Sequence, residues 1–503
     1  MIRNNAVSYL DDIATKIPEN IAIVDGEIQI SYMDLLKLSK GVGTWLTENG
    51  YTRKNIAILL PKGSSAIISF FGSLYSGNTY VPLDYNDAKD RIIKIIKKVE
   101  APVVITDEKN ASWLKDAGIN ACIYNDIKKD SIDDEKINAI LKKTYDLEPA
   151  YIMHTSGSTG EPKGVVVHHR GIIDFIDWIT AYMGLNDKSV IALQSPFHFD
   201  ASVFDIYSCI AVGSKIVIMP DVLAQFPAKV PQFIEENNIT CIFWVPGLLA
   251  NIANSGVLKE YKMETLKLFT FIGEIMPTKQ LNMWIKENPN REYINLYGPT
   301  EATVACTAYR IEESLADTDV IPIGKASENK RILILNEENK QAECGEVGEI
   351  CIAGSGVALG YYKEKELTER VFVQNPLNSN YEDIIYRTGD YGYINKNGDI
   401  IFSGRRDTQV KIHGIRVELG DIENAACCLD GVERACALLM NSETVLLFLQ
   451  TKEIFQKRQL KQQLKEYLPK YMIPNDVYSV EEFPINKNGK IDRKELLKLA
   501  IEG

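Results

Sequence analysis

Short apolar runs that alternate with helical patterns constrain the fold of this chain more than any other feature. An amphipathic segment at 86–99, NDAKDRIIKIIKKV, stands between two of the runs. Repeated strand–helix units place helices on both faces of a parallel sheet, so the pattern predicts an α/β fold. The runs are IAILL at 56–60, PVVIT at 102–106, KIVIM at 215–219, CIFWV at 241–245 and LKLFTFIG at 266–273.

The pattern changes along the second half of the chain. From about residue 320 short strands and glycines predict a smaller β-rich section, in which KNGD at 396–399 is typical of a hairpin turn. After GRRD at 404–407 the pattern is mixed again, with helices expected at 419–428, at 455–467 and at the end of the chain. A chain of 503 residues exceeds one hydrophobic core, so we expect a domain boundary there.

Composition excludes several classes of protein. The net charge of -12 argues against a nucleic-acid surface, which needs clustered Lys and Arg. The nine cysteines include no CxxC pair, so neither a zinc site nor a disulfide framework is indicated. Acidic residues in the N-terminal segment and the lack of a membrane-length apolar run predict no signal peptide and no membrane span. We expect a cytoplasmic monomer with small-molecule or protein partners.

A loop rich in glycine, serine and threonine stands at 153–164, with the sequence MHTSGSTGEPKG. Backbone N–H groups in such a loop form a concave nest for anionic oxygens, and Lys163 adds a positive charge. A Walker A loop is excluded because Lys163 lies between Pro162 and Gly164 and does not open a helix. The loop predicts a polyphosphate site; a surface turn is the alternative for this composition.

The order TSGSTGEPKG resembles the signature loop of the adenylate-forming enzymes, which include acyl-CoA synthetases, luciferases and the adenylation domains of non-ribosomal peptide synthesis. Further motifs similar to those of this family follow in order over nearly the whole chain: NLYGPTEATVA at 295–305, YRTGD at 386–390, GRRDTQVKIHGIRVELGDIE at 404–423, LPKYMIP at 468–474 and NKNGKIDR at 486–493. The resemblance implies an α/β fold in two domains. Residues 1–406 would form a large N-terminal domain of two α/β sheet subdomains plus a small β-barrel, and residues 407–503 a small mobile α+β C-terminal domain.

By this resemblance the chain binds ATP and Mg²⁺ and transfers AMP to a carboxylate. Transfer brings two anions together, so the site must neutralise charge and align the attack. Thr300 is expected at the α-phosphate and Glu301 at the magnesium ion, which prefers oxygen ligands. Arg405 is expected near the ribose and the phosphates. The other nucleotide contacts are expected from Thr155, Ser156, Gly157, Ser158, Thr159 and Lys163 at the phosphates, Asn295 and Tyr297 at the adenine and Asp390 at the ribose hydroxyls.

Lys490 in NGKIDR resembles the lysine that bridges the substrate carboxylate and the α-phosphate in this family. An ammonium there stabilises the charge that develops during transfer. Because Lys490 belongs to the small domain, it leaves when that domain rotates, and Asp407 resembles the hinge. For Lys490 the alternative is an ordinary surface lysine.

The segment PFHFDASVFDIY at 196–207 favours an amino acid as the substrate. Asp200 resembles the aspartate that pairs with the α-ammonium group in this family, whereas fatty and aryl acids have no ammonium to offset a buried carboxylate. A helix cap at 201–210 is the alternative role for Asp200. The side-chain pocket, apolar and fit for a small or medium aliphatic amino acid, is expected from Ala201, Phe204, Phe243, Thr270, Ile272, Leu296, Gly298, Val304 and Ala305.

The identity of the acceptor rests on motifs near the end of the sequence. No Gly-Gly-x-Ser segment follows NGKIDRKELLKLAIEG, so we expect the phosphopantetheine thiol of a separate carrier protein. LFTFIGEIMP is also similar to D-alanine:carrier-protein ligases, although Ile272 stands where those typically have Cys. An acyl- or aryl-CoA ligase is the alternative, and a non-catalytic nucleotide-binding protein is the third possibility.

Overall fold

The computed structural model describes residues 3–155, 162–312, 315–405, 409–412, 415–440, 443–451, 456–484, 491 and 493–502. Contacts divide the chain into two compact units. The first unit comprises Met1–Tyr85, Val99–Met153 and Gly164–Arg406, and the second comprises Asn86–Lys98, His154–Lys163 and Asp407–Gly503. Two short segments from the first third of the chain thus group with its last part, and the Lys98 ammonium links them by donating a hydrogen bond of 3.0 Å to the Pro162 carbonyl.

The largest sheet of the first unit has nine strands. Its central strands are parallel, and antiparallel strands close both edges. Three of the expected apolar runs form its central strands, as the α/β prediction requires. In spatial order the strands are β15 (Lys325–Ala326), β14 (Thr307–Ile311), β13 (Glu292–Tyr297), β12 (Leu268–Ile272), β11 (Cys241–Trp244), β9 (Val190–Leu193), β10 (Lys215–Ile218), β1 (Ile21–Asp25) and β2 (Ile28–Ser31).

A second sheet has six strands, and its β6, β5, β3, β4 and β7 pair in parallel. Together the two sheets and their helices confirm the α/β class. The strands are, in spatial order, β6 (Ala121–Ile123), β5 (Val104–Thr106), β3 (Asn55–Leu59), β4 (Thr79–Pro82), β7 (Pro149–Thr155) and β8 (Lys163–His168).

Side chains of the nine-stranded sheet alternate between two apolar cores, because successive residues of a strand point to opposite faces. In β11, Phe243 belongs to the core that also holds α1, α2, α3 and α7. Its neighbour Trp244 belongs to the core formed with α10, α11 and α12. The helices of this unit are α1 (Ser8–Lys16), α2 (Tyr32–Glu48), α3 (Ser64–Tyr75), α5 (Glu108–Asp116), η1 (Tyr124–Asp126), α6 (Asp134–Leu141), α7 (His169–Met183), α8 (Ala201–Val203), η2 (Phe204–Ser208), α9 (Cys209–Val212), η3 (Asp221–Gln225), η4 (Pro227–Lys229), α10 (Val230–Glu236), α11 (Pro246–Asn254), η5 (Val257–Lys259), α12 (Thr278–Glu287), η6 (Thr300–Ala302) and α13 (Lys365–Val371).

The β-rich section forms a five-stranded antiparallel sheet. The KNGD turn joins β19 to β20, with Ile394 opposite Ile400, so the predicted hairpin is confirmed. The strands of this sheet are β16 (Lys330–Leu335), β17 (Gly348–Gly354), β18 (Phe372–Gln374), β19 (Ile384–Ile394) and β20 (Ile400–Arg405).

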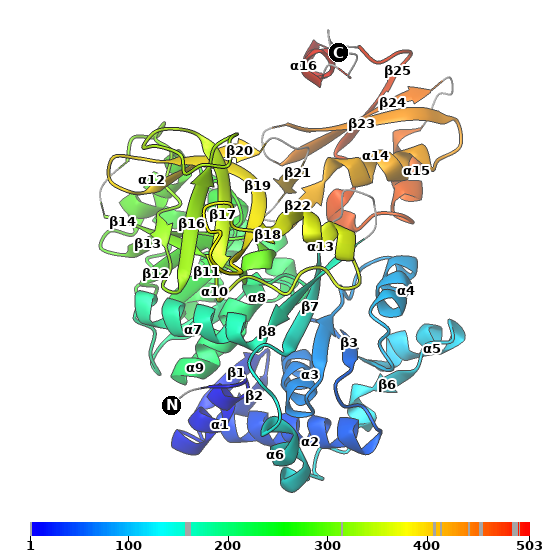
Figure 1. The fold of residues 1–503 in the computed structure, drawn as a ribbon, viewed down its shortest axis with the longest axis vertical. Coiled ribbons are helices and arrows are strands. Elements are labelled where there is room, and N and C mark those ends of the chain that lie inside the picture. Colours follow the sequence, from blue (N-terminus) through cyan, green and yellow to red (C-terminus); the bar gives the residue numbers. More distant parts are fainter. Residues whose placement is uncertain are drawn as a thin grey trace. The chain divides into compact units, whose positions relative to one another are not determined.

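The second unit is built around the strands β23, β24 and β25. Helices α14 and α15 cover one face of this sheet and α16 the other, as Figure 1 shows. Leu447 faces the first pair of helices and its neighbour Phe448 faces α16. The elements of the unit are α4 (Lys89–Lys98), β21 (Gln409–Ile412), β22 (Ile415–Glu418), α14 (Leu419–Cys427), β23 (Val432–Met440), β24 (Thr444–Thr451), α15 (Lys457–Leu464), η7 (Lys470–Met472), β25 (Asp476–Val480) and α16 (Arg493–Glu502).

Two further properties concern the thiols and the helices of the described part of the chain. All nine cysteines are free thiols. Every helix in the described part of the chain is too short or too polar to span a bilayer.

Candidate active site

A buried carboxylate lies where β19 and β20 pair in the first unit. Asp390 stands opposite Arg405 in the antiparallel register and is 5% exposed. The Tyr297 hydroxyl donates a hydrogen bond of 2.5 Å to its Oδ2, and Arg405 Nη1 donates one of 2.6 Å to its Oδ1. Burial, together with the charge of Asp390, raises the pKa of Tyr297, so its hydroxyl remains a donor at neutral pH. The structure therefore unites three residues that the sequence assigned to one nucleotide.

A cavity of about 300 Å³ lies beside this cluster, lined in part by Phe402 and Gly404, which lie in β20 shortly before Arg405. The Phe402 ring centroid is 6.3 Å from that of Tyr297. Asn295 donates a hydrogen bond of 2.8 Å from Nδ2 to the carbonyl of Pro322, the residue after Ile321, which lines the cavity. The cavity is mainly apolar, with Ile275, Met276, Pro277, Val320, Ile321 and Phe402 contributing side chains. Sequence analysis did not identify these residues, because they come from three separate segments.

Glu301 lies in η6, directly after Thr300, and is completely buried. The Tyr361 hydroxyl donates a hydrogen bond of 2.6 Å to its Oε1. A single buried carboxylate of this kind fits a magnesium ion that takes its other ligands from phosphates and water. The described residues include no cluster of three or more His, Cys, Asp or Glu side chains that could hold a metal ion. Tyr361 was missed because sixty positions separate it from Glu301.

Gly298 lets two parts of the NLYGPTEATVA segment approach each other closely. A Cβ on Gly298 would lie 2.6 Å from both the Ala305 Cα and the Val304 carbonyl oxygen. Any larger residue would force the 303–305 turn away from β13, so glycine is required by space here.

The predicted side-chain pocket residues lie together on one face of the nine-stranded sheet. Phe204 and Phe243 are fully buried and stack with ring centroids 4.1 Å apart. Strand register places Phe243 beside Thr270 and Ile272 beside Leu296. The same apolar core contains Phe204, Phe243, Ile272, Leu296, Val304 and Ala305, with Ala201 packed against it. These side chains form an apolar environment, and none of them carries a charge.

Asp200 directly precedes Ala201, the first of these residues. It has a helical backbone conformation and its side chain caps no helix, so the alternative role as a cap is not supported. The expected helix at 201–210 is interrupted, because α8 gives way to the π-helical η2 before α9 begins. Nearby Tyr151 is fully buried, and its hydroxyl has no hydrogen-bond partner among the described residues. Burial first, and then the charge of Asp200, raises the pKa of Tyr151.

The phosphate loop belongs to the second unit. Thr155 ends β7, and Lys163 begins β8 with 8% exposure. Ser156, Gly157, Ser158 and Thr159 lie outside the described residues. So do the predicted hinge residue Asp407 and the predicted catalytic residue Lys490.

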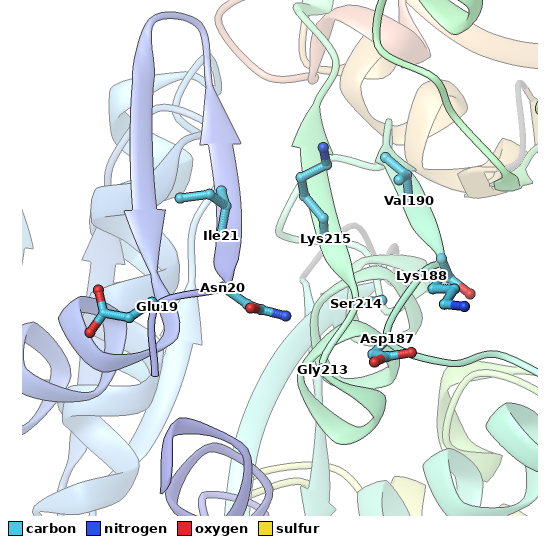
Figure 2. A pocket seen from close by; sticks show the side chains of 10 residues that line it. Glu19, Asn20, Ile21, Asp187, Lys188, Val190, Gly213, Ser214 and Lys215 are labelled. Atoms are coloured by element: carbon cyan, nitrogen blue, oxygen red, sulfur yellow. The ribbon is translucent and has the colours of Figure 1, made fainter. Parts of the chain in front are cut away.

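A second cavity of the first unit, about 440 Å³, lies elsewhere (Figure 2). Its lining includes Ile21, Val190 and Lys215, which begin the parallel strands β1, β9 and β10. Figure 2 shows the Asn20 side chain pointing toward the turn at Gly213 and Ser214. Open α/β sheets bind ligands at the carboxyl ends of their strands, so this amino-end cavity is not the candidate active site.

One protein-family model matches more than half of the chain. The model described as "AMP-binding enzyme" matches residues 10–362. The chain is 30% identical over 496 residues to zwittermicin A synthase ZmaJ of Bacillus cereus, covering 96% of this chain and 93% of that one. It is 31% identical over 499 residues to a D-alanine–D-alanyl carrier protein ligase of Bacillus cytotoxicus, covering 96% of this chain and 97% of that one. Two longer relatives are spanned only to 36% and 44% of their length.

Solved structures share the fold. The Vibrio cholerae adenylation domain AlmE, solved in complex with glycyl-adenosine-5'-phosphate, matches with a TM-score of 0.86 at 23% identity. The match covers 100% of this chain and 99% of that one, so the similarity of fold extends over the complete length.

Proposed function

The chain belongs to the family of AMP-binding enzymes, and from that premise we propose that it adenylates an amino acid with ATP and then passes the aminoacyl group to a carrier-protein thiol. The first step yields aminoacyl-AMP and pyrophosphate. The observation that carries the amino-acid assignment is Asp200, whose carboxylate caps no helix and which directly precedes Ala201, the first of the residues predicted to line the side-chain pocket.

The nucleotide binds at the cluster around Asp390. A carboxylate accepts two hydrogen bonds readily, and the two ribose hydroxyls are donors that suit it. Tyr297 and Arg405 hold one carboxylate oxygen each and so fix its orientation before ATP arrives. The adenine base occupies the apolar cavity beside Phe402, where Asn295 and backbone groups supply its polar contacts.

Glu301 and Thr300 serve the phosphate end of the nucleotide. The Tyr361 hydroxyl orients Glu301, whose carboxylate holds Mg²⁺ together with phosphate oxygens. The ion neutralises phosphate charge when bound. Lys163 and the rest of the phosphate loop bind the phosphates that leave, and Lys490 stabilises the transferring group; both roles rest on the sequence motifs.

The amino acid binds with its ammonium group at Asp200. Its side chain enters the pocket closed by the Phe204 and Phe243 pair, whose volume favours a small or medium aliphatic side chain. Without a buried charge among the lining residues, a charged side chain would enter at a high desolvation cost.

The acceptor is the phosphopantetheine thiol of a carrier protein. Similarity over 97% of a ligase named for a D-alanyl carrier protein supports this choice. The second step uses rotation of residues 407–503 about Asp407. We place the reaction in the cytoplasm, where ATP is available and nine free thiols stay reduced, and we expect the enzyme to act as a monomer.

The test is exchange of labelled pyrophosphate into ATP, with magnesium, across a panel of L-amino acids, D-alanine, aryl acids and short fatty acids. We expect exchange with one or a few aliphatic amino acids. The Asp390→Asn variant should need more ATP for the same rate with each of them. Exchange only with aryl or fatty acids would overturn the amino-acid assignment and favour the CoA ligase.

A further inference from the structure

A buried ion pair lies behind the pocket, outside the residues assigned above. The Lys330 ammonium at the start of β16 is 3.2 Å from Oδ2 of Asp174 in α7. Their side chains are 0% and 3% exposed. Asn329 donates from Nδ2 to the other carboxylate oxygen at 3.0 Å. The ammonium also lies 5.6 Å from the ring centroid of Trp178, within cation–π range.

Stability alone does not explain a charged pair at this place. Desolvation of two ions largely offsets their attraction, and apolar residues of similar volume often stabilise a core as well or better. The role of the Lys330 ammonium therefore depends on its contacts other than Asp174.

Lys330 Nζ also donates to the main-chain carbonyl of Ala305, at 3.4 Å. This bond is long, but its donor is charged and both groups are buried. Ala305 and its neighbour Val304 belong to the predicted pocket wall. The ion pair thus contacts the predicted pocket wall through the Ala305 backbone carbonyl and not through a side chain of the wall.

The turn that Lys330 holds is strained. Thr303 and Val304 have φ angles of 57° and 65°, the left-handed region that β-branched residues avoid. Such backbone conformations are energetically unfavourable and persist only where their surroundings impose them. The Thr303 hydroxyl donates to the Gly356 carbonyl at 2.8 Å, and the Ala305 amide donates back to the Thr303 carbonyl at 2.8 Å.

Two glycines leave room for this arrangement. A Cβ on Gly356 would lie 2.2 Å from Cε of Lys330, and one on Gly171 of α7 would lie 2.6 Å from Oγ1 of Thr303. Elements from three parts of the chain, α7, β16 and the segment after β17, therefore converge on the 303–305 turn.

We propose that Lys330 and Asp174 are positioning residues that fix the 303–305 turn and thereby set the width of the amino-acid pocket. This inference rests on the proposed function for the identity of the pocket. It predicts that the ion pair changes the KM for the amino acid much more than the KM for ATP, because the nucleotide cluster at Asp390 has other partners.

The test compares the full-length protein with the double variant Asp174→Asn/Lys330→Met and the single variant Lys330→Met. The single variant leaves a buried carboxylate without its cation and should lose the most stability. The double variant removes both charges and should recover much of that loss. Its KM for the amino acid should still rise about tenfold, with the KM for ATP within about twofold of wild type. A matched control is Glu338→Gln/Lys340→Met, which removes an ion pair that is 71% and 72% exposed just beyond β16.

Hydrogen exchange of backbone amides gives a readout that needs no substrate. Peptides covering 298–308 should exchange faster in the double variant, whereas those of β23 and β24 and those of the exposed-pair control should match wild type. Unchanged exchange at 298–308 would overturn the proposal, even if the wild-type enzyme activates no amino acid and the proposed function fails. Faster exchange there with a wild-type KM for the amino acid would contradict the claim that the ion pair sets the width of the amino-acid pocket, since the pair would then only stabilise the turn.

Discussion

Asp200 has a helical backbone conformation, but its side chain caps no helix. Helix capping therefore does not account for an aspartate at this position. If its carboxylate pairs with the substrate ammonium, Asp200→Asn should lower kcat/KM for the amino acid about 100-fold, because a buried cation then loses its charged partner. The KM for ATP should stay near wild type. Pyrophosphate exchange at several amino-acid concentrations measures this, and an unchanged kcat/KM would remove the ammonium partner from the account.

His169 gives a residue-scale prediction about pH. Burial, followed by the charge of His168, lowers its pKa from 6.5 to about 4, and its Nδ1 accepts a hydrogen bond of 3.2 Å from the Ala6 amide. Below pH 6.5 the unfolded chain takes up a proton that the folded chain refuses. Stability from this residue is therefore complete above that pH and is lost as the pH falls toward 4, by about 3 kcal/mol.

The comparison that isolates His169 is His169→Gln, whose amide oxygen can still accept from Ala6. Urea unfolding at about pH 7 and about pH 5 should show a smaller loss of stability for the variant than for wild type. Equal losses would mean that His169 does not titrate as its burial indicates. Burial also lowers the pKa of His154, to about 3. Its contribution to the loss of stability is the same in wild type and in His169→Gln, so it cancels when the two losses are compared.

At the scale of elements, the π-helical η2 carries a group that the proposed reaction does not use. Asp205 is completely buried, and neither of its carboxylate oxygens has a hydrogen-bond partner among the described residues. Burial raises its pKa well above 3.8, with Lys62 opposing the shift. The folded protein thus keeps a proton that the unfolded chain releases, so stability falls as the pH rises above 3.8.

Asp205→Asn should remove this dependence. The melting temperature of the variant, relative to wild type, should increase between about pH 5 and about pH 8. Differential scanning calorimetry at both pH values measures the trend. A difference that stays constant with pH would contradict the assignment of a buried, protonated carboxyl group to η2.

The sequence identified those elements whose signals are local. Apolar runs marked β3, β5, β10, β11 and β12, and the KNGD turn marked the β19–β20 hairpin, because strand burial and turn chemistry depend on neighbouring residues. It could not identify the Lys330–Asp174 pair, whose partners lie 156 positions apart and look like surface charges. The break at η2 was also missed, since no local residue preference distinguishes a π-helical turn there.

At the scale of the whole molecule, the two units have separate apolar cores. All five tryptophans belong to the first unit, so tryptophan fluorescence reports on that unit alone, whereas circular dichroism reports on both. Leu447 is fully buried in the second unit, and Leu447→Ala should destabilise that unit by about 3 kcal/mol.

The expected result is a lower unfolding midpoint in circular dichroism with an unchanged midpoint in fluorescence. Leu193→Ala, in β9 of the first unit, is the reciprocal control and should shift the fluorescence midpoint. Equal shifts of both signals in Leu447→Ala would show that the units unfold as one cooperative body.

The grouping of Asn86–Lys98 and His154–Lys163 with the second unit is the whole-molecule feature that the sequence did not indicate. The first segment lies within the strand–helix repeats and the second holds the glycine-rich loop, and only long-range contacts group them with the last part of the chain. The division at 406 and 407 as two functional domains, with Lys490 in the smaller one, stays a prediction.

The central claim is that this enzyme activates an acid because that acid carries an α-ammonium group. The most direct test compares pyrophosphate exchange for the best amino acid with exchange for its deaminated analogue, the same carbon skeleton without nitrogen. The account predicts that the analogue supports at least about 100-fold less exchange than the amino acid, since the analogue brings no ammonium group to pair with the Asp200 carboxylate. Equal exchange with both would contradict the claim and identify the enzyme as a ligase for simple carboxylic acids.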